Sequence, residues 1–121
     1  MKKESILRDK SYLFAVRNVK LAQFLQQEKK EFVLCRQILK SGTAIGALIR
    51  EAEYAQSNAD FINKLSISLK EANETAYRLS LLKDTDYIDL KLHESLLYDC
   101  NELISMLVSS IKTLKKVKSS K

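Results

Sequence analysis

The chain of 121 residues is 45% hydrophobic and 30% charged, contains no Pro or Trp and only two Gly, and carries a formal net charge of +6. This apolar fraction supports one domain, over residues 1–121, that folds without metal or disulfide, and it excludes a mostly disordered chain. The lack of Pro and Gly disfavours a β-sandwich or barrel, which needs turn residues at short intervals. We therefore expect a single helix-rich domain.

The positive charge is concentrated at the C-terminal end. Residues 1–111 hold sixteen Lys and Arg against fifteen Asp and Glu, whereas the last ten residues hold five Lys and no acid. Such a tail either binds a nucleic-acid backbone or is a solvated helix end whose cations favour the negative pole of the helix macrodipole. The lysines that would bind nucleic acid are Lys112, Lys115, Lys116 and Lys118, with Lys2 and Lys3 from the other terminus.

Helical periodicity divides the chain into four stretches, at about 5–26, 32–56, 58–83 and 90–117. The breaks between them are short and polar, which favours antiparallel neighbours and an all-α, up-down-up-down four-helix bundle. Ser57 or Asn58 can cap the third helix and Asp89 the fourth. This topology places both termini and the second break at one end, where Arg8 and Lys10 join the C-terminal lysines. The opposite end collects acids, namely Glu28, Glu31, Asp84, Asp86 and Asp89.

The first helix has apolar residues around nearly its whole circumference, so one core-facing stripe cannot absorb them all. We expect the surplus to form a contact between subunits, although scattered apolar residues also occur on ordinary surfaces. The predicted contact residues are Tyr12, Leu13, Val16 and Phe24.

The second helix contains a run of small residues around Gly42 and Gly46, each of which costs helix stability, by about 1 kcal/mol relative to Ala. Close packing of two helices explains such a run, and a ligand cleft is the less favoured alternative. Polar residues of the third helix, among them Ser68 and Thr75, either face Arg50 and Glu51 in a buried network or form a solvated face.

Residue types that would carry chemistry are few. The single histidine, His93, has Leu90 three positions earlier, so the Glu-x-x-His spacing of a di-iron bundle is absent. His93 and Cys100 lie about 10 Å apart along one helix, too far for a nucleophile pair. Both Cys35 and Cys100 fall in apolar stripes and should be buried free thiols. We expect no catalytic residue, cofactor, metal or small-molecule substrate.

Sorting signals are equally sparse. Charged residues interrupt the N-terminal stretch, and no segment approaches the roughly 18 uninterrupted apolar residues of a membrane span. The free cysteines fit a reducing compartment. These observations favour a cytoplasmic protein with no membrane partner.

Residues 41–52, 55–57 and 60–75 closely resemble the "four helix bundle protein" family, whose founding members are encoded in intervening sequences of bacterial 23S ribosomal RNA genes. The resemblance implies a cytoplasmic bundle that assembles as a homopentamer and has no known enzymatic activity. A related branch, the accessory protein of diversity-generating retroelements, associates with nucleic acid. The positions that carry the family signature, which we assign to helix packing, are Ser41, Gly42, Thr43, Gly46, Arg50, Glu51, Asp60, Lys64, Glu71, Asn73 and Glu74.

The function predicted from these features is that of a non-enzymatic, homopentameric scaffold that binds RNA or a nucleoprotein through its basic bundle ends. Binding would be weak and independent of base sequence, because it would rest on phosphate contacts. The alternative is an adaptor for a protein partner that does not bind nucleic acid and whose lysines only keep it in solution.

Overall fold

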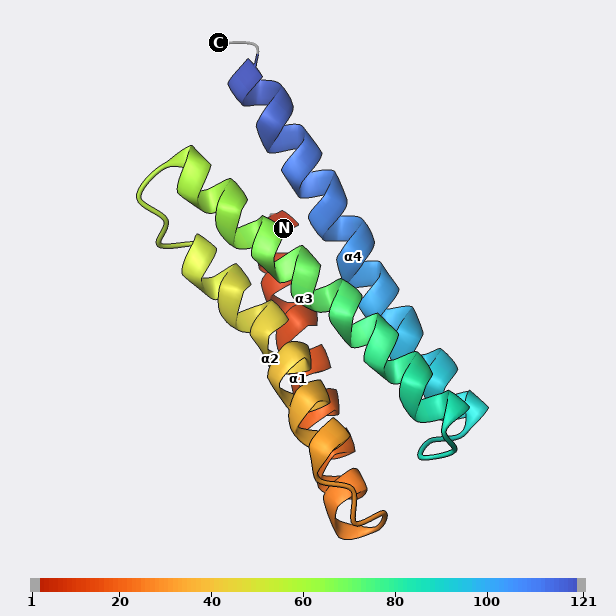
Figure 1. Cartoon of the computed structure of the whole chain (residues 1–121). Helices are drawn as coiled ribbons and strands as arrows, with labels where there is room; N and C mark the ends of the chain where they lie inside the picture. The colour runs from red at the N-terminus through yellow and green to blue at the C-terminus, as the bar shows by residue number, and fades with distance from the viewer. Residues whose placement is uncertain (1–2, 120–121) are drawn as a thin grey trace.

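The computed structural model describes residues 3–119, with side chains from Ile6 to Val117, and folds them into four helices (Figure 1). These are α1 (Lys3–Gln27), α2 (Val33–Ala52), α3 (Asn58–Asp84) and α4 (Leu90–Ser119). Within the described residues α1 packs on α2, α2 on α3, α3 on α4 and α4 on α1, whereas no Cα atoms of the diagonal pairs approach within 8 Å. The predicted all-α, up-down-up-down bundle is confirmed.

Side-chain caps start three of the helices. Ser57 Oγ accepts a hydrogen bond from the N–H of Asp60 at 3.1 Å, and Asp89 Oδ1 accepts one from the N–H of Leu92 at 2.8 Å. Both caps agree with the sequence prediction. The start of α2 is held by Glu31, whose carboxylate accepts from the N–H of Cys35 at 2.9 Å. Each cap satisfies a backbone donor that has no partner inside its helix.

The α1–α2 and α3–α4 loops each contain a residue in the left-handed backbone region, Lys30 (φ 54°) and Asp86 (φ 66°). In the second loop the N–H of Tyr87 donates to the carbonyl of Leu82, five residues earlier, at 2.8 Å, and the N–H of Asp86 donates to the carbonyl of Lys83 at 3.0 Å. This pattern closes the end of a helix and usually places Gly at the left-handed position. Two non-glycine residues therefore adopt a costly backbone conformation here.

α2 ends at Ala52, four residues earlier than the sequence predicts. The N–H of Glu53 bonds to the carbonyl of Arg50, only three residues back, at 3.1 Å, and this tighter pattern ends the helix. Ala52 is also the last buried residue before the turn, and none of the residues 53–56 is buried. The predicted extension to Gln56 is wrong because it gains no contact with the core.

Every helix contributes apolar side chains to the core. Phe14, Ile45, Leu79 and Leu107 are at most 1% exposed and come from the four helices in turn. On α2 one continuous stripe at steps of three and four is buried: Cys35, Ile38, Gly42, Ile45, Ile49 and Ala52.

α1 buries one regular stripe in which two members are polar. Its members recur at steps of four and three: Leu7, Ser11, Phe14, Asn18, Leu21 and Leu25. Asn18 Nδ2 donates to the carbonyl of Phe14 at 2.8 Å, while its Oδ1 is buried with no hydrogen-bond partner in the described part of the chain. Other apolar residues of α1 lie outside the stripe, as the sequence predicts.

The glycines of α2 bring that helix close to α1. A Cβ at Gly42 would lie 2.3 Å from Cγ of Asn18, and one at Gly46 would lie 3.3 Å from the carbonyl oxygen of Ser11. No residue larger than Gly fits at position 42 unless Asn18 moves. The packing role predicted for these glycines is confirmed.

The α1–α4 contact relies on charged side chains more than the other three do. Arg17 Nη1 lies 2.8 Å from Asp99 Oδ2 and also donates to the carbonyl of Ser95 at 3.3 Å. Lys10 Nζ lies 3.0 Å from Glu102 Oε1. These pairs are partly exposed, so they orient the two helices more than they stabilise them.

Both ends of the described chain lie at the end of the bundle that holds the α2–α3 turn, and the last turns of α4 project beyond the other helices there (Figure 1). No helix in residues 3–119 combines the length and apolar character that a membrane span needs.

Candidate nucleic-acid interface

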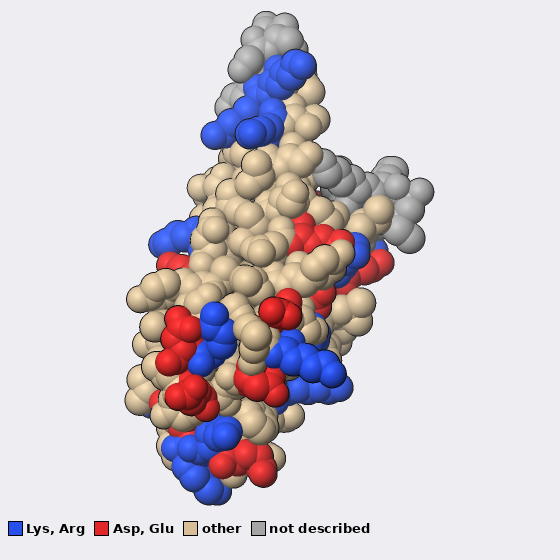
Figure 2. Space-filling view, turned by 90° about the vertical axis from the view of Figure 1, so that its right-hand side faces the viewer, with Lys and Arg blue, Asp and Glu red and all other residues tan. Residues whose placement is uncertain are grey.

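The last turns of α4 carry the predicted basic end. Lys112, Lys115 and Lys116 are exposed, and their spacing of three and four residues places them on one side of the helix. Figure 2 shows Lys and Arg at the projecting tip, with no acidic side chain next to them in that view. Lys2 and the side chains of Lys3 and Lys118 lie outside the described residues, so these three predictions stay open.

Two cations expected at the same end are neutralised by acids. Arg8 Nη1 lies 3.4 Å from Glu53 Oε1, and its Nε lies 3.5 Å from Asp9 Oδ1. Lys10 pairs with Glu102 across the α1–α4 contact. Of the cations discussed here, the α4 lysines therefore add the most positive charge to this end.

The opposite end is mixed in charge instead of acidic. The predicted acids are there, in the α1–α2 loop and around the α3–α4 loop, but Lys29, Lys30 and Lys83 lie among them. Lys83 Nζ is 3.5 Å from Asp84 Oδ1. Figure 2 accordingly shows both signs of charge interspersed away from the tip. The lysines offset part of the negative charge, so the predicted polarity from end to end is weakened.

Charge separates between helix pairs instead. Residues 1–52, which contain α1 and α2, hold eleven Lys and Arg against five Asp and Glu, a net charge of +6. Residues 53–111, which contain α3 and most of α4, hold five against ten, a net charge of −5. The near-neutral body inferred from the sequence thus conceals a basic half and an acidic half.

The four residues predicted to form a subunit contact do not all lie on one side of α1. Tyr12 and Leu13 are 57% and 63% exposed, Phe24 is 37% exposed and Val16 is half-buried. Leu13 lies beside Asp99 and Glu102 of α4, whereas Tyr12 lies beside α2. Val19, 38% exposed, is another apolar residue of α1 outside the buried stripe, and the sequence prediction of contact residues did not include it.

The signature residues of α2 have distinct roles. Ser41 and Gly42 are buried, and the half-buried Thr43 donates to the carbonyl of Leu39 at 2.7 Å. Arg50 is exposed, and its Cζ lies 5.7 Å from the centroid of the Tyr12 ring. The sequence contains both residues of this cation–π pair, but only the fold brings them together.

The polar residues of α3 divide into a buried set and a surface set. Ser41 Oγ donates to Thr75 Oγ1 at 3.0 Å, because the single hydroxyl proton of Thr75 goes to a carbonyl of its own helix, and Ser68 Oγ donates to the carbonyl of Ile45 at 2.9 Å. These two neutral bonds form the buried polar link between α2 and α3. The charged members lie at the surface, so the alternative of a buried ion-pair network is wrong.

Those surface members make local contacts. Glu51 Oε1 lies 3.5 Å from Lys64 Nζ, and Asn73 Nδ2 donates to the carbonyl of Leu69 at 3.2 Å. Glu74 pairs with Arg78 one turn later, and Asp60 Oδ2 accepts from the N–H of Gln56 at the α3 cap. The carbonyl of Glu71 accepts from the hydroxyl of Thr75. All of these contacts support packing or helix ends.

Both thiols are buried and free, as predicted. Cys35 and Cys100 each donate to a carbonyl of a neighbouring helix at 3.2 Å, those of Ala22 and Ala72. Burial raises the pKa of both thiols, that of Cys100 to about 12. Neither is a nucleophile at neutral pH, because the reactive thiolate is scarce.

His93 is a buried residue of the bundle interior. Its Nε2 lies 3.3 Å from Ser80 Oγ, and its Nδ1 is buried with no hydrogen-bond partner among the described residues. No group of three or more His, Cys, Asp or Glu within residues 3–119 is arranged to hold a metal ion.

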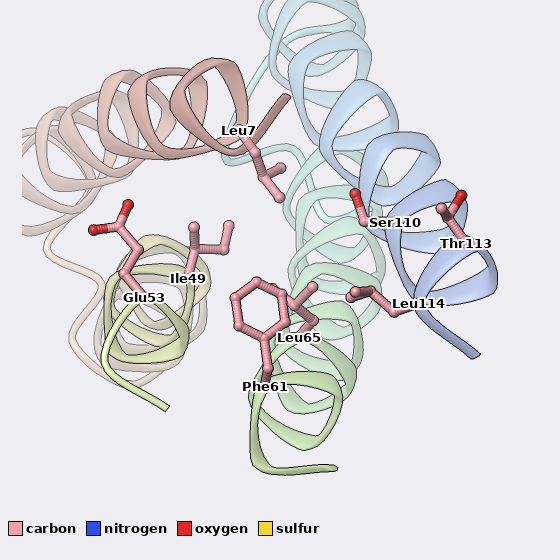
Figure 3. A pocket seen from close by; sticks show the side chains of 8 residues that line it. All are labelled: Leu7, Ile49, Glu53, Phe61, Leu65, Ser110, Thr113 and Leu114. Atoms are coloured by element: carbon pink, nitrogen blue, oxygen red, sulfur yellow. The ribbon is translucent and has the colours of Figure 1, made fainter. Parts of the chain in front are cut away.

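A cavity of about 120 Å³ lies where the four helices separate near the basic end. Figure 3 shows Leu7, Ile49, Phe61, Leu65 and Leu114 around it, with at least one side chain from each helix. Its polar rim consists of Glu53, which is paired with Arg8, and of Ser110 and Thr113. The lining is apolar, and no catalytic arrangement of polar groups faces it.

The fold and the basic helix end define a small all-helical bundle protein with a charged projecting tip. The chain belongs to the 23S rRNA-intervening sequence protein family, whose model matches residues 3–109. It is also similar to a protein of unknown function from the S23 ribosomal protein family of Bacteroides thetaiotaomicron, with 58% identity over 92% of this chain and 99% of that one. The TM-score of that crystal structure is 0.91. No curated protein matches the chain.

Proposed function

We propose that the protein is a non-enzymatic homo-oligomeric scaffold that binds RNA, free or within a nucleoprotein, through the projecting end of α4. The observation that carries this proposal is the charge distribution. Arg8 and Lys10, two of the cations expected at that end, face carboxylates, whereas the exposed Lys112 and Lys116 have no acid within the last ten residues. Lysines in such a position bind phosphates as point charges and do not select a base sequence.

Assembly would turn a weak site into a useful one. The exposed apolar residues Leu13 and Phe24 on α1 favour contact with a second copy, and the family resemblance implies a pentamer. Several tips on one particle raise the overall affinity for a long RNA without any new contact. We therefore propose that self-association and RNA binding depend on separate surfaces.

The experiment compares the intact chain with a variant in which Lys112, Lys115 and Lys116 are replaced by Gln. Substitution is preferable to truncation at Ile111 because Leu114 packs against the core. Binding of a labelled single-stranded RNA is followed by anisotropy over a salt series, and mass is followed by light scattering. A matched control replaces Lys20, Lys70 and Lys91, three exposed lysines far from the tip.

The proposal requires the tip variant to lose most RNA binding while its mass stays unchanged and the control variant binds normally. Equal losses in the two variants would mean that only net charge matters. If the intact chain binds no RNA at low salt, the lysines are a solubilising tail and the protein-adaptor alternative gains support.

A further inference from the structure

An open groove between α1 and α2 brings an exposed aromatic ring next to cations. Its volume is about 300 Å³, and its floor includes the small residues Ala15, Gly46 and Ala47. Tyr12 and Arg50 stand at its edge in the cation–π contact described above. The two helices lie side by side over most of their length (Figure 1).

Several cations on α2 are not paired with an acidic side chain. Within the described residues Arg36, Lys40 and Arg50, on α2, take part in no ion pair, and the half of the chain that contains them has a net charge of +6. Steps of four and ten residues keep them near one side of the helix. An anionic polymer would meet a row of positive charge along α2.

One exposed aromatic residue lines the groove, and another follows the end of α2. Tyr12 is 57% exposed, and Tyr54, in the turn that follows α2, is 85% exposed. Arg50 thus contacts one exposed ring, that of Tyr12, and precedes another, that of Tyr54, by four residues. The tip of α4, by contrast, carries no aromatic residue after Tyr98.

One end of the groove lies next to the end cavity. Arg8, which lines the groove, pairs with Glu53, and Glu53 lines the end cavity together with Thr113 and Leu114 of α4. Lys112 and Lys116 lie in the same turns of α4 as those two residues. A flexible single strand can therefore reach both places.

We propose that the α1–α2 groove is a binding site for single-stranded RNA, in which a base stacks on Tyr12 and the adjoining phosphate contacts Arg50. This inference rests on the proposed function and adds the polymer's strandedness and its path. Stacking on an aromatic ring tolerates every base, so the site adds affinity without sequence preference. Arg50 and the α2 cations supply the electrostatic part.

The test measures binding of a labelled oligouridylate to the Tyr12→Ala, Tyr12→Phe and Arg50→Ala variants of the full chain. Tyr12→Ala should lower affinity about tenfold, because it removes one stacked base, while Tyr12→Phe should keep it. Arg50→Ala should make the salt slope shallower by about 0.7, the value for one phosphate contact on a single strand. Tyr98→Ala is the matched control, since Tyr98 is 71% exposed on the acidic half.

The outcomes separate this inference from the proposal on which it rests. If substitution of the α4 lysines abolishes binding while Tyr12→Ala behaves like Tyr98→Ala, the tip binds RNA and the groove does not. If Tyr12→Ala reduces the mass measured by light scattering, Tyr12 belongs to a subunit contact and the groove site is refuted. Equal affinity for duplex and single-stranded RNA would also refute it. If the intact chain binds no RNA, the proposed function itself fails.

Discussion

The close approach of α1 and α2 at Gly42 predicts that Gly42→Ala destabilises the protein even though Ala is the better helix former. The new Cβ would lie 2.3 Å from Cγ and 2.5 Å from Oδ1 of Asn18, which is fully buried. Asn18 can move only by breaking its 2.8 Å bond to the carbonyl of Phe14. The substitution therefore forces either a backbone shift or a lost hydrogen bond.

The magnitude follows from three opposing effects. Replacing a mid-helix Gly by Ala gains about 1 kcal/mol of helix propensity. Overpacking a dense core costs about 1–3 kcal/mol, and the lost hydrogen bond of Asn18 costs about 1 kcal/mol. The expected net loss is about 1–3 kcal/mol. At Gly46 the nearest atom is 3.3 Å away, so Gly46→Ala should change stability by less than about 1 kcal/mol.

Urea unfolding followed by circular dichroism, at one fixed protein concentration, measures both variants. The double variant Asn18→Ala/Gly42→Ala should recover part of the loss, because the clash disappears with the side chain that caused it. A Gly42→Ala protein as stable as the wild type, or a larger loss at Gly46 than at Gly42, would refute the packing described here.

Four further predictions follow from the fold. Thr75→Val should cost about 1–3 kcal/mol in urea unfolding, because Ser41 loses its buried partner, whereas Thr113→Val, at an exposed site with a similar local bond, should cost almost nothing; equal costs would contradict the assigned burial. Lys30→Gly should raise the unfolding midpoint, by up to about 1 kcal/mol of stability, because Gly adopts a positive φ without strain; a lower midpoint would contradict this. Arg17→Ala should cost less than about 1 kcal/mol, and the cost should shrink in high salt; a salt-independent loss would show that packing dominates instead. Burial raises the pKa of Cys100 to about 12 from an ordinary value of 9.0, so this thiol should resist iodoacetamide at pH 8 until the chain unfolds. The free energy of unfolding should also fall as pH rises from about 9 to 12, because the unfolded chain loses the thiol proton first. Rapid labelling of the folded protein would exclude the buried position.

The sequence predicted the helices well because their signals are local. The apolar stripe of α2 and the caps at Ser57 and Asp89 depend on neighbours within one or two turns. The stripe of α1 was harder to recognise because Ser11 and Asn18 occupy two of its core positions. A regular step of three and four through both residues was the signal that could have revealed it.

The candidate site was less predictable because it depends on contacts between helices. The α4 lysines are visible in the sequence as a run without acids, but the pairing of Lys10 with Glu102 joins residues 92 positions apart. The same holds for Tyr12 and Arg50, which no local pattern connects. Dividing the charge count at residue 52 would have revealed the basic half, and only the fold gives a reason to divide it there.

The most direct test of the proposed function is the salt dependence of RNA binding by the intact protein, measured by anisotropy with a labelled single-stranded RNA. Three α4 lysines that each neutralise one phosphate predict that the logarithm of the binding constant falls against the logarithm of salt concentration with a slope of about −2 or steeper. No binding at low salt, or binding that salt leaves unchanged, would contradict the account of the basic tip as a nucleic-acid interface.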